Sequence, residues 1–244
     1  MTLEICIDSV HSAIEAEKGG ADRVELCNNL FEGGTTPSAG SIALCRKHIQ
    51  IGLFVLIRPR GGDFLYSDLE FEIIKQDIKV AKNLGADGIV VGILKADGTI
   101  DQERMSIIME HCHPLPVTFH RAFDMAIEPF QALEDIIGLG ASRILTSGQE
   151  RSAFEGTDLL ADLVKKANQR IIIMAGGGVT ERNIAKIHRL TGITEFHSSA
   201  RKKVSSNMQY QQNQVFMGGE LRIPEFVNSF ADAEKIRKMK GILL

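Results

Sequence analysis

One stretch of the sequence places several ionisable side chains directly after a short apolar segment. Residues 116–119 (Pro-Val-Thr-Phe) have the pattern of a buried strand, and His120, Arg121 and Asp124 follow at once. Charged groups at the end of a buried strand cost free energy unless they pair with each other or with a ligand. His120 is therefore a candidate general base, with Asp124 as the carboxylate that orients it. A histidine that is hydrogen-bonded without catalysis is the equally common alternative.

The same order of an apolar run, polar residues and then a helix recurs along the chain. Residues 146–148, 176–178 and 197–199 each end such a run. This recurrence predicts a site built from the same end of many strands. Side chains two positions apart on a strand share a face. The pairs that we assign to the interior face are Glu4 and Cys6, Glu25 and Cys27, Arg58 and Arg60, Thr118 and His120, and Glu195 and His197.

That interior face mixes carboxylates, guanidinium groups, imidazoles and thiols. Ionisable groups gathered at one mouth usually face a ligand. The alternative is a salt-bridged polar layer that only closes the core. If the face is catalytic, Glu25 is a candidate proton carrier beside His120, because each has a charged neighbour that can tune its pKa.

Several groups at these strand ends suit an anion. Arg58 and Arg60 flank a proline, and guanidinium groups bind carboxylate or phosphate in a bidentate manner. Pairing with Glu25 or Asp63 is the alternative for these arginines. The glycine turn at 176–178 suits the usual phosphate position of an eight-stranded barrel, although it also suits a simple tight turn. The predicted anion-binding residues are Arg58, Arg60, Arg121, Gly177, Gly178, His197, Ser198 and Ser199.

Two of the four cysteines differ from the others in their position. Cys6 and Cys27 end the first two predicted strands on the inward face, and neighbouring strands lie about 4.8 Å apart. Two thiolates at that separation could bind a soft monovalent ion such as Cu(I). The alternative is a pair of unmodified core thiols. Cys45 and Cys112 fall on predicted helices and are expected to be packing residues.

Strands and helices alternate along the whole predicted chain. The predicted strands are 3–7, 23–27, 51–57, 88–91, 116–119, 143–145, 171–174 and 195–197. The predicted helices are 9–19, 37–47 with Thr36 as N-cap, 67–84 with a capping box at Ser67 and Glu70, 101–111, 128–138, 157–167, 180–190 with Thr180 as N-cap, and 231–239.

A repeated turn supports this order of elements. Residues 20–22, 85–87, 140–142 and 192–194 each begin with glycine and each stand between a helix and a strand. Eight strands that alternate with eight helices in 244 residues predict a single (β/α)8 TIM barrel in the α/β class, with a longer C-terminal extension. We expect one domain over 1–244, with a core of about 1–200 and a tail and closing helix over about 201–244. A doubly wound sheet is the alternative, but no GxGxxG follows the first strand.

Composition excludes several classes of function. With 28 basic and 31 acidic residues and a net charge of −3, the chain has no basic cluster suited to nucleic acid. Its apolar runs are strand-sized, so no membrane span is expected. Because the sequence opens with a strand-like run, no signal peptide is expected, and the scattered cysteines are typical of reduced intracellular thiols.

Six segments together resemble the CutC family over residues 1 to about 200. They are 25–27 (ELC), 33–38 (GGTTPS), 57–64 (IRPRGGDF), 118–124 (TFHRAFD), 145–148 (LTSG) and 176–178 (GGG). The resemblance implies a (β/α)8 barrel and a cytoplasmic role in copper homeostasis. It also implies copper binding by Cys6 and Cys27, which the face assignment selects independently.

Two hypotheses of different class therefore stand. The first is a copper-homeostasis protein of the CutC family that binds Cu(I) through Cys6 and Cys27. The second is a TIM-barrel enzyme that acts on a small anionic metabolite, phosphorylated or carboxylated, at the C-terminal mouth. The expected partners are a copper ion, a small anionic ligand and further copies of the chain in a homo-oligomer, either a dimer or a tetramer.

Overall fold

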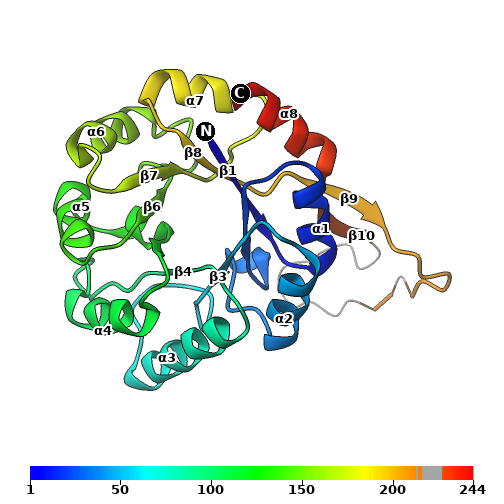
Figure 1. Cartoon of the computed structure of the whole chain (residues 1–244), viewed down its shortest axis with the longest axis horizontal. Coiled ribbons are helices and arrows are strands. Elements are labelled where there is room, and N and C mark those ends of the chain that lie inside the picture. The colour runs from blue at the N-terminus through cyan, green and yellow to red at the C-terminus, as the bar shows by residue number, and fades with distance from the viewer. Residues whose placement is uncertain (213, 216–226, 244) are drawn as a thin grey trace.

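A closed barrel of eight parallel strands forms the centre of the computed structural model (Figure 1). The structure describes residues 1–212, 214–215 and 227–243. Each strand pairs with the next in chain order, and β8 pairs with β1 to close the ring. The strands are β1 (Thr2–Ile7), β2 (Arg23–Leu26), β3 (Gly52–Leu56), β4 (Gly88–Val91), β5 (Val117–Phe119), β6 (Arg143–Thr146), β7 (Ile172–Ala175) and β8 (Glu195–Ser198).

Helices surround the barrel on the outside (Figure 1). They are α1 (Val10–Lys18), α2 (Ala39–His48), α3 (Asp68–Asn83), α4 (Gln102–Cys112), α5 (Pro129–Gly138), α6 (Thr157–Ala167), α7 (Ile184–Thr191) and α8 (Ala233–Leu243). The predicted (β/α)8 fold is confirmed. Because the strands are parallel, the residues that end them meet at one mouth, as the sequence predicted for Cys6, Arg58, His120 and His197.

The predicted starts of three helices are wrong. The closing helix α8 begins at Ala233, because Ala231 ends strand β10 (Val227–Ala231). Ser38, not Thr36, is the N-cap of α2, because its side chain accepts from the backbone N–H of Ser41. Helix α7 begins after Asn183, so Thr180 lies in the preceding loop. The capping box of α3 is confirmed, with Ser67 and Glu70 each accepting from the other's backbone N–H.

Four elements were not predicted. A 3₁₀ helix, η2 (Arg121–Met125), occupies the segment directly after β5, and another, η1 (Leu30–Glu32), follows β2. In the extension, β9 (Arg201–Ser205) pairs antiparallel with β10 (Val227–Ala231). The predicted polar stretch after Ala200 lies partly outside the described residues. The division of the chain into a core and an extension within one domain stays a prediction.

Apolar side chains pack on both sides of the barrel wall. A large cluster lies between strands and helices, and includes Ile5, Val24 and Leu26 from the helix-facing positions of β1 and β2. A small inner cluster contains Cys6, Cys27, Phe54, Leu56 and Val90. The face assignment for β1 and β2 is therefore confirmed, because Cys6 and Cys27 lie inside while their sequence neighbours lie outside.

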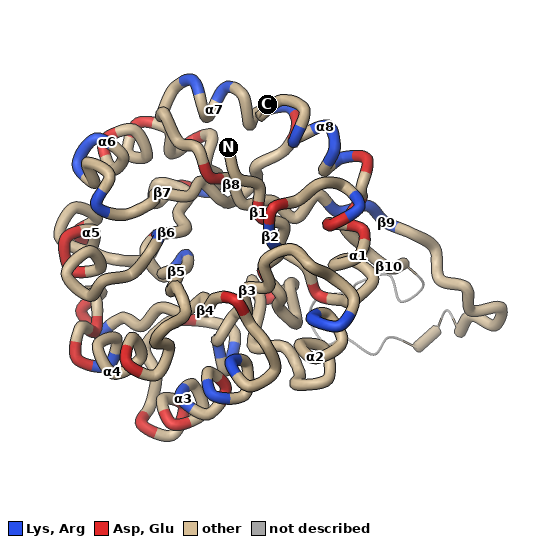
Figure 2. The backbone as a smooth tube through the Cα atoms, in the orientation of Figure 1, with Lys and Arg blue, Asp and Glu red and all other residues tan. Residues whose placement is uncertain are grey.

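Charge lies on the outer helices and also on strands within the ring (Figure 2). Charged side chains enclosed by a barrel require partners, and those partners define the site described below. Across residues 1–212, 214–215 and 227–243, no helix combines the length and the hydropathy that crossing a bilayer demands.

Candidate functional site

The thiols of Cys6 and Cys27 lie together inside the barrel. The strands β1 and β2 are hydrogen-bonded neighbours, with Cys6 opposite Glu25 in the register. The two sulfur atoms are 3.7 Å apart, and all four cysteines of the chain are free thiols. A separation of 3.7 Å is well beyond the roughly 2.05 Å of a disulfide bond. The pair is thus a preformed dithiol.

A carboxylate and an imidazole adjoin this dithiol. One ligand atom each from Cys6, Glu25 and Cys27 lie within 4.8 Å of one another. The Nε2 atom of His197 lies 3.5 Å from the Glu25 carboxylate, and its Nδ1 atom lies 2.7 Å from that of Glu4. Two sulfur atoms and one oxygen atom are a donor set that could hold a metal ion with a preference for soft ligands.

The environment of the dithiol makes its two sulfur atoms unequal. A hydrogen bond from Cys27 and the nearby His197 lower the pKa of Cys6 to about 5, against the effect of burial. The hydrogen bond to Cys6, together with burial, raises the pKa of Cys27 well above its usual value. Burial and the charge of Cys6 raise the pKa of Glu25. At neutral pH the arrangement favours one thiolate and one thiol.

Beneath the dithiol lies a layer of ion pairs that spans the barrel interior. Arg23 pairs with Glu4 and lies 2.6 Å from Glu195, which also contacts Arg143 at 3.3 Å. Burial would raise the pKa of Glu4, but the bonds from His197 and Arg23 lower it to about 2. The alternative of a salt-bridged layer is thus realised one level below the thiols. Sequence reasoning missed Arg23, although it shares the strand face of Glu25 and Cys27.

His120 and Asp124 do not form the predicted dyad. The backbone N–H of Ala122 donates to Nδ1 of His120, and Nε2 is buried with no partner among the described residues. Burial and the charge of Arg58 lower the pKa of His120 to about 3, so its ring is neutral. The ring packs 4.9 Å from that of Phe64. His120 is therefore buried at the mouth, and its role as a base stays a prediction.

The Asp124 carboxylate organises the loop after β6 instead. It accepts from the hydroxyl of Thr146, from the backbone N–H of Ser147 at 3.1 Å and from that of Gln149 at 3.2 Å. It also pairs with Arg121 at 2.7 Å. These bonds place the guanidinium of Arg121 at the mouth.

The guanidinium groups of Arg58 and Arg60 bind atoms of their own loops. Arg58 donates to the carbonyl oxygens of Glu32, Gly34 and Gly62 at 2.7–2.8 Å. Arg60 pairs with Glu70 and with Asp63, the second of which was the predicted alternative. Arg58 has no such pairing with Glu25 among the described ion pairs. Both arginines stay predicted anion ligands, but their contacts position loops.

A cavity of about 530 Å³ opens at the mouth beside β1, β7 and β8. It contains Cys6 and much of the predicted anion-binding set, and adds Arg201 and Lys235 from the extension. Cys6 is 8% exposed and lines this cavity, whereas Cys27 at 2% does not. The side chains other than apolar ones that line it are those of Cys6, Arg121, Thr180, Glu181, His197, Ser198, Ser199, Arg201 and Lys235, and Gly33, Gly177 and Gly178 line it with their backbone.

Six predicted site residues lie outside the lining of this cavity. They are Glu25, Cys27, Arg58, Arg60, His120 and Asp124. No sequence signal could have added Lys235, because its helix α8 reaches the mouth only through tertiary packing.

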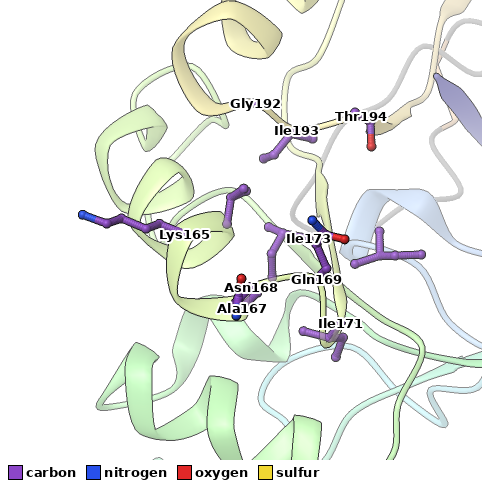
Figure 3. A pocket seen from close by; sticks show the side chains of 11 residues that line it. Lys165, Ala167, Asn168, Gln169, Ile171, Ile173, Gly192, Ile193 and Thr194 are labelled. Atoms are coloured by element: carbon purple, nitrogen blue, oxygen red, sulfur yellow. The ribbon is translucent and has the colours of Figure 1, made fainter.

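A larger hollow of about 640 Å³ lies at the opposite end of β7, between the end of α6 and the start of β8. Figure 3 shows isoleucines 171, 173 and 193 in its wall, with Lys165 pointing away from them. None of the predicted site residues lies there. The predicted site is therefore at the other mouth.

Known proteins resemble this chain over most of its length. The sequence profile of the CutC family matches residues 1–202. A copper homeostasis protein cutC homolog from Homo sapiens is 51% identical over 240 residues, which are 98% of this chain and 88% of that protein. A family protein CutC from Chromobacterium violaceum is 49% identical over 241 residues, which are 99% of this chain and 97% of that protein.

Solved structures agree with these sequence matches. A protein from Streptococcus agalactiae, described as a copper homeostasis protein CutC, superposes with a TM-score of 0.79 at 37% identity over 82% of this chain and 98% of that one. Thiamine phosphate pyrophosphorylase from Pyrococcus furiosus is 16% identical at a TM-score of 0.59, over 99% of this chain and 95% of that one, which shows a shared barrel fold alone. On the sequence matches and the fold together, the chain belongs to the CutC family.

Proposed function

We propose that this protein acts in copper homeostasis by binding Cu(I) through the thiolates of Cys6 and Cys27. The observation that carries the proposal is the 3.7 Å between two sulfur atoms on adjacent strands. The human relative and the Streptococcus agalactiae structure are both described as copper homeostasis proteins, which supports it. We place this role in the cytoplasm, where free thiols stay reduced.

The donor set fits a soft ion better than a hard one. Thiolates select Cu(I), whereas Mg²⁺ and Ca²⁺ take oxygen ligands. Phe54, Leu56 and Val90 pack around the sulfur atoms and limit access by water. Cys6 faces the mouth cavity, which gives an ion a route to the dithiol. Because thiolates are the ligands, affinity should fall on acidification.

A competition titration against a Cu(I) chelator, carried out under anaerobic conditions, tests the proposal. We expect one Cu(I) per chain, and a loss of tight binding in both Cys6→Ser and Cys27→Ser. Cys112→Ser is the matched control, since that thiol is equally buried but lies on α4. Unchanged affinity in the double Cys6→Ser, Cys27→Ser variant would remove this site from consideration.

A second candidate function is catalysis on a small anionic metabolite, phosphorylated or carboxylated. The mouth cavity favours it, because Arg121 lies there beside Cys6 and His197. A copper site alone does not require such cationic lining. Incubation with phosphate esters and carboxylates, followed by mass spectrometry, should reveal a product. A broad panel without turnover would reject the catalytic reading and leave the copper proposal intact. Assembly into a dimer or tetramer stays a prediction, and light scattering can test it by measuring the mass of the protein in solution.

A further inference from the structure

We propose that the mouth cavity is a phosphate-binding site completed by the C-terminal extension. Lys235 of α8 is the cationic side chain of this site that has the fewest partners within the described chain. The ligand class is a phosphate monoester whose organic part extends toward Cys6 and His197. The inference rests on the second proposed function, the anionic-metabolite reading, and narrows it to a ligand class and a set of contacts.

Backbone donors form one side of this site. Gly177 and Gly178 follow β7 with φ of +94° and +73°. Their N–H groups donate to no acceptor among the described residues, and neither does that of Ser199. Successive N–H groups in such a turn form a concave surface that attracts anions. A Cβ at Gly177 would lie 3.4 Å from Cζ of Arg121, so the absence of a side chain lets a ligand reach the backbone N–H groups beside Arg121.

The loop after β8 is held in a strained shape next to these donors. Ala200 has a φ of +43°, which is rare for a residue with a side chain. The Ser198 hydroxyl donates to the carbonyl of Val179 at 2.6 Å and accepts from the N–H of Ala200 at 3.3 Å. One buried hydroxyl therefore fixes the β7 and β8 loops against each other. Such strain is typical of functional sites.

Cationic side chains reach the cavity from separate elements. Arg121 is held by Asp124 and by the Ser147 hydroxyl, which leaves its Nη1 atom free among the described contacts. Arg201 pairs with Asp8.

Lys235 is different from both arginines. Its ammonium group donates only to the carbonyl of Arg201, at 2.7 Å, and has no carboxylate partner in the part of the chain that the structure describes. Two N–H donors and a full charge are left at the cavity. Among the described residues, Glu181 is the one acidic side chain in the lining of the cavity.

The spread of these donors favours phosphate over carboxylate. A carboxylate presents two oxygen atoms in one plane, whereas a phosphate monoester presents three around a tetrahedral centre. The backbone turn, Arg121 and Lys235 belong to different elements and can each take one oxygen. A volume of about 530 Å³ exceeds what a phosphate group needs, so space remains for an organic group toward His197.

Titration of the full chain with inorganic phosphate, followed by calorimetry, tests the site. Lys235→Gln should weaken phosphate binding about tenfold or more, since it removes a charge-assisted hydrogen bond. Lys238→Gln is the matched control on the same helix, because that side chain is 62% exposed and outside the cavity. It should leave affinity within about twofold, as expected for a surface charge. Thermal melts of both variants exclude misfolding as the cause.

Three outcomes would overturn the proposal. They are an absence of phosphate binding by the wild-type chain, equal affinities for the two lysine variants, and tighter binding of succinate than of phosphate. Cys27→Ser separates this site from the copper site, because it should abolish Cu(I) binding and keep phosphate affinity. Phosphate binding without turnover of any phosphate ester would reject catalysis alone and leave the site in place.

Discussion

The guanidinium of Arg23 on β2 lies 2.6 Å from the carboxylate of Glu195 on β8, across the intervening strand β1. The same guanidinium also pairs with Glu4 on β1. One buried cation thus ties together the three strands where the barrel closes. The side chains of Arg23 and Glu195 are only 9% and 13% exposed, so water cannot replace either partner.

Arg23→Met should be strongly destabilising. The substitution leaves Glu4 and Glu195 buried without this cation, and breaking a buried pair from one side costs about 3–5 kcal/mol. Urea denaturation followed by circular dichroism measures the loss. Lys238→Gln serves as the exposed control and should be close to neutral. Similar midpoints for the two variants would contradict the role of Arg23.

His120 should make stability depend on acid. Its pKa is lowered from 6.5 to about 3 in the folded chain, by burial and then by the charge of Arg58. Between pH 6.5 and 3, the His120 imidazole therefore binds a proton in the unfolded chain but not in the folded chain. The contribution of neutral His120 to the free energy of unfolding is complete above pH 6.5. It falls by roughly 1.4 kcal/mol per pH unit as the pH drops from 6.5 toward 3.

The difference between wild type and His120→Asn isolates this contribution from that of other groups. We expect the unfolding free energy of the variant to fall less steeply between pH 6.5 and 4. A nuclear magnetic resonance titration gives a direct check on the wild-type chain. A His120 imidazole that titrates near pH 6.5 would show that the ring is not desolvated.

The fold was predictable from sequence because its determinants are local. Apolar runs of strand length alternate with helices eight times, and four glycine turns recur between them. The face of Cys6 and Cys27 followed from strand periodicity and from the apolar residues next to them. The start of α2 was missed because Thr36 and Ser38 are both suitable caps on either side of a proline. Only the hydrogen bond to Ser41 distinguishes them.

The site was less predictable, because its contacts come from distant parts of the chain. The spacing of His120 and Asp124 suggested a dyad, but Thr146 and the loop after it bind Asp124 more closely. The interior position of Arg23 could have been predicted, because Arg23 shares a strand face with Glu25. The position of Lys235 at the mouth could not have been predicted, because it depends on the packing of α8 against α1.

Arg58→Lys should loosen the mouth without removing its charge. The guanidinium donates to carbonyls of Glu32, Gly34 and Gly62, and an ammonium cannot span all three. We expect a loss of about 2–3 kcal/mol, the cost of leaving buried acceptors unpaired. Arg60→Lys is the matched control, since its side chain is 38% exposed and should matter much less. Equal melting temperatures for the two variants would show that Arg58 does not clamp these loops.

Gly88→Ala and Gly241→Ala should change stability in opposite directions. An added Cβ at Gly88, on β4 inside the barrel, would lie 2.5 Å from the ring of Phe54. That ring also packs against the Arg23 and Arg143 guanidinium groups at 5.2 and 5.1 Å, so it cannot retreat without disturbing the ion pairs. Overpacking of this kind costs about 1–3 kcal/mol.

Gly241 lies within α8, and a Cβ there would meet no atom of the described residues within 4 Å. Alanine is the better helix former, so Gly241→Ala should stabilise the chain by up to about 1 kcal/mol. Chemical denaturation of both variants measures the two signs in one experiment. If Gly88→Ala left the free energy of unfolding unchanged, the ring of Phe54 would be free to move. The layer of ion pairs beneath Cys6 and Cys27 would then not be rigid.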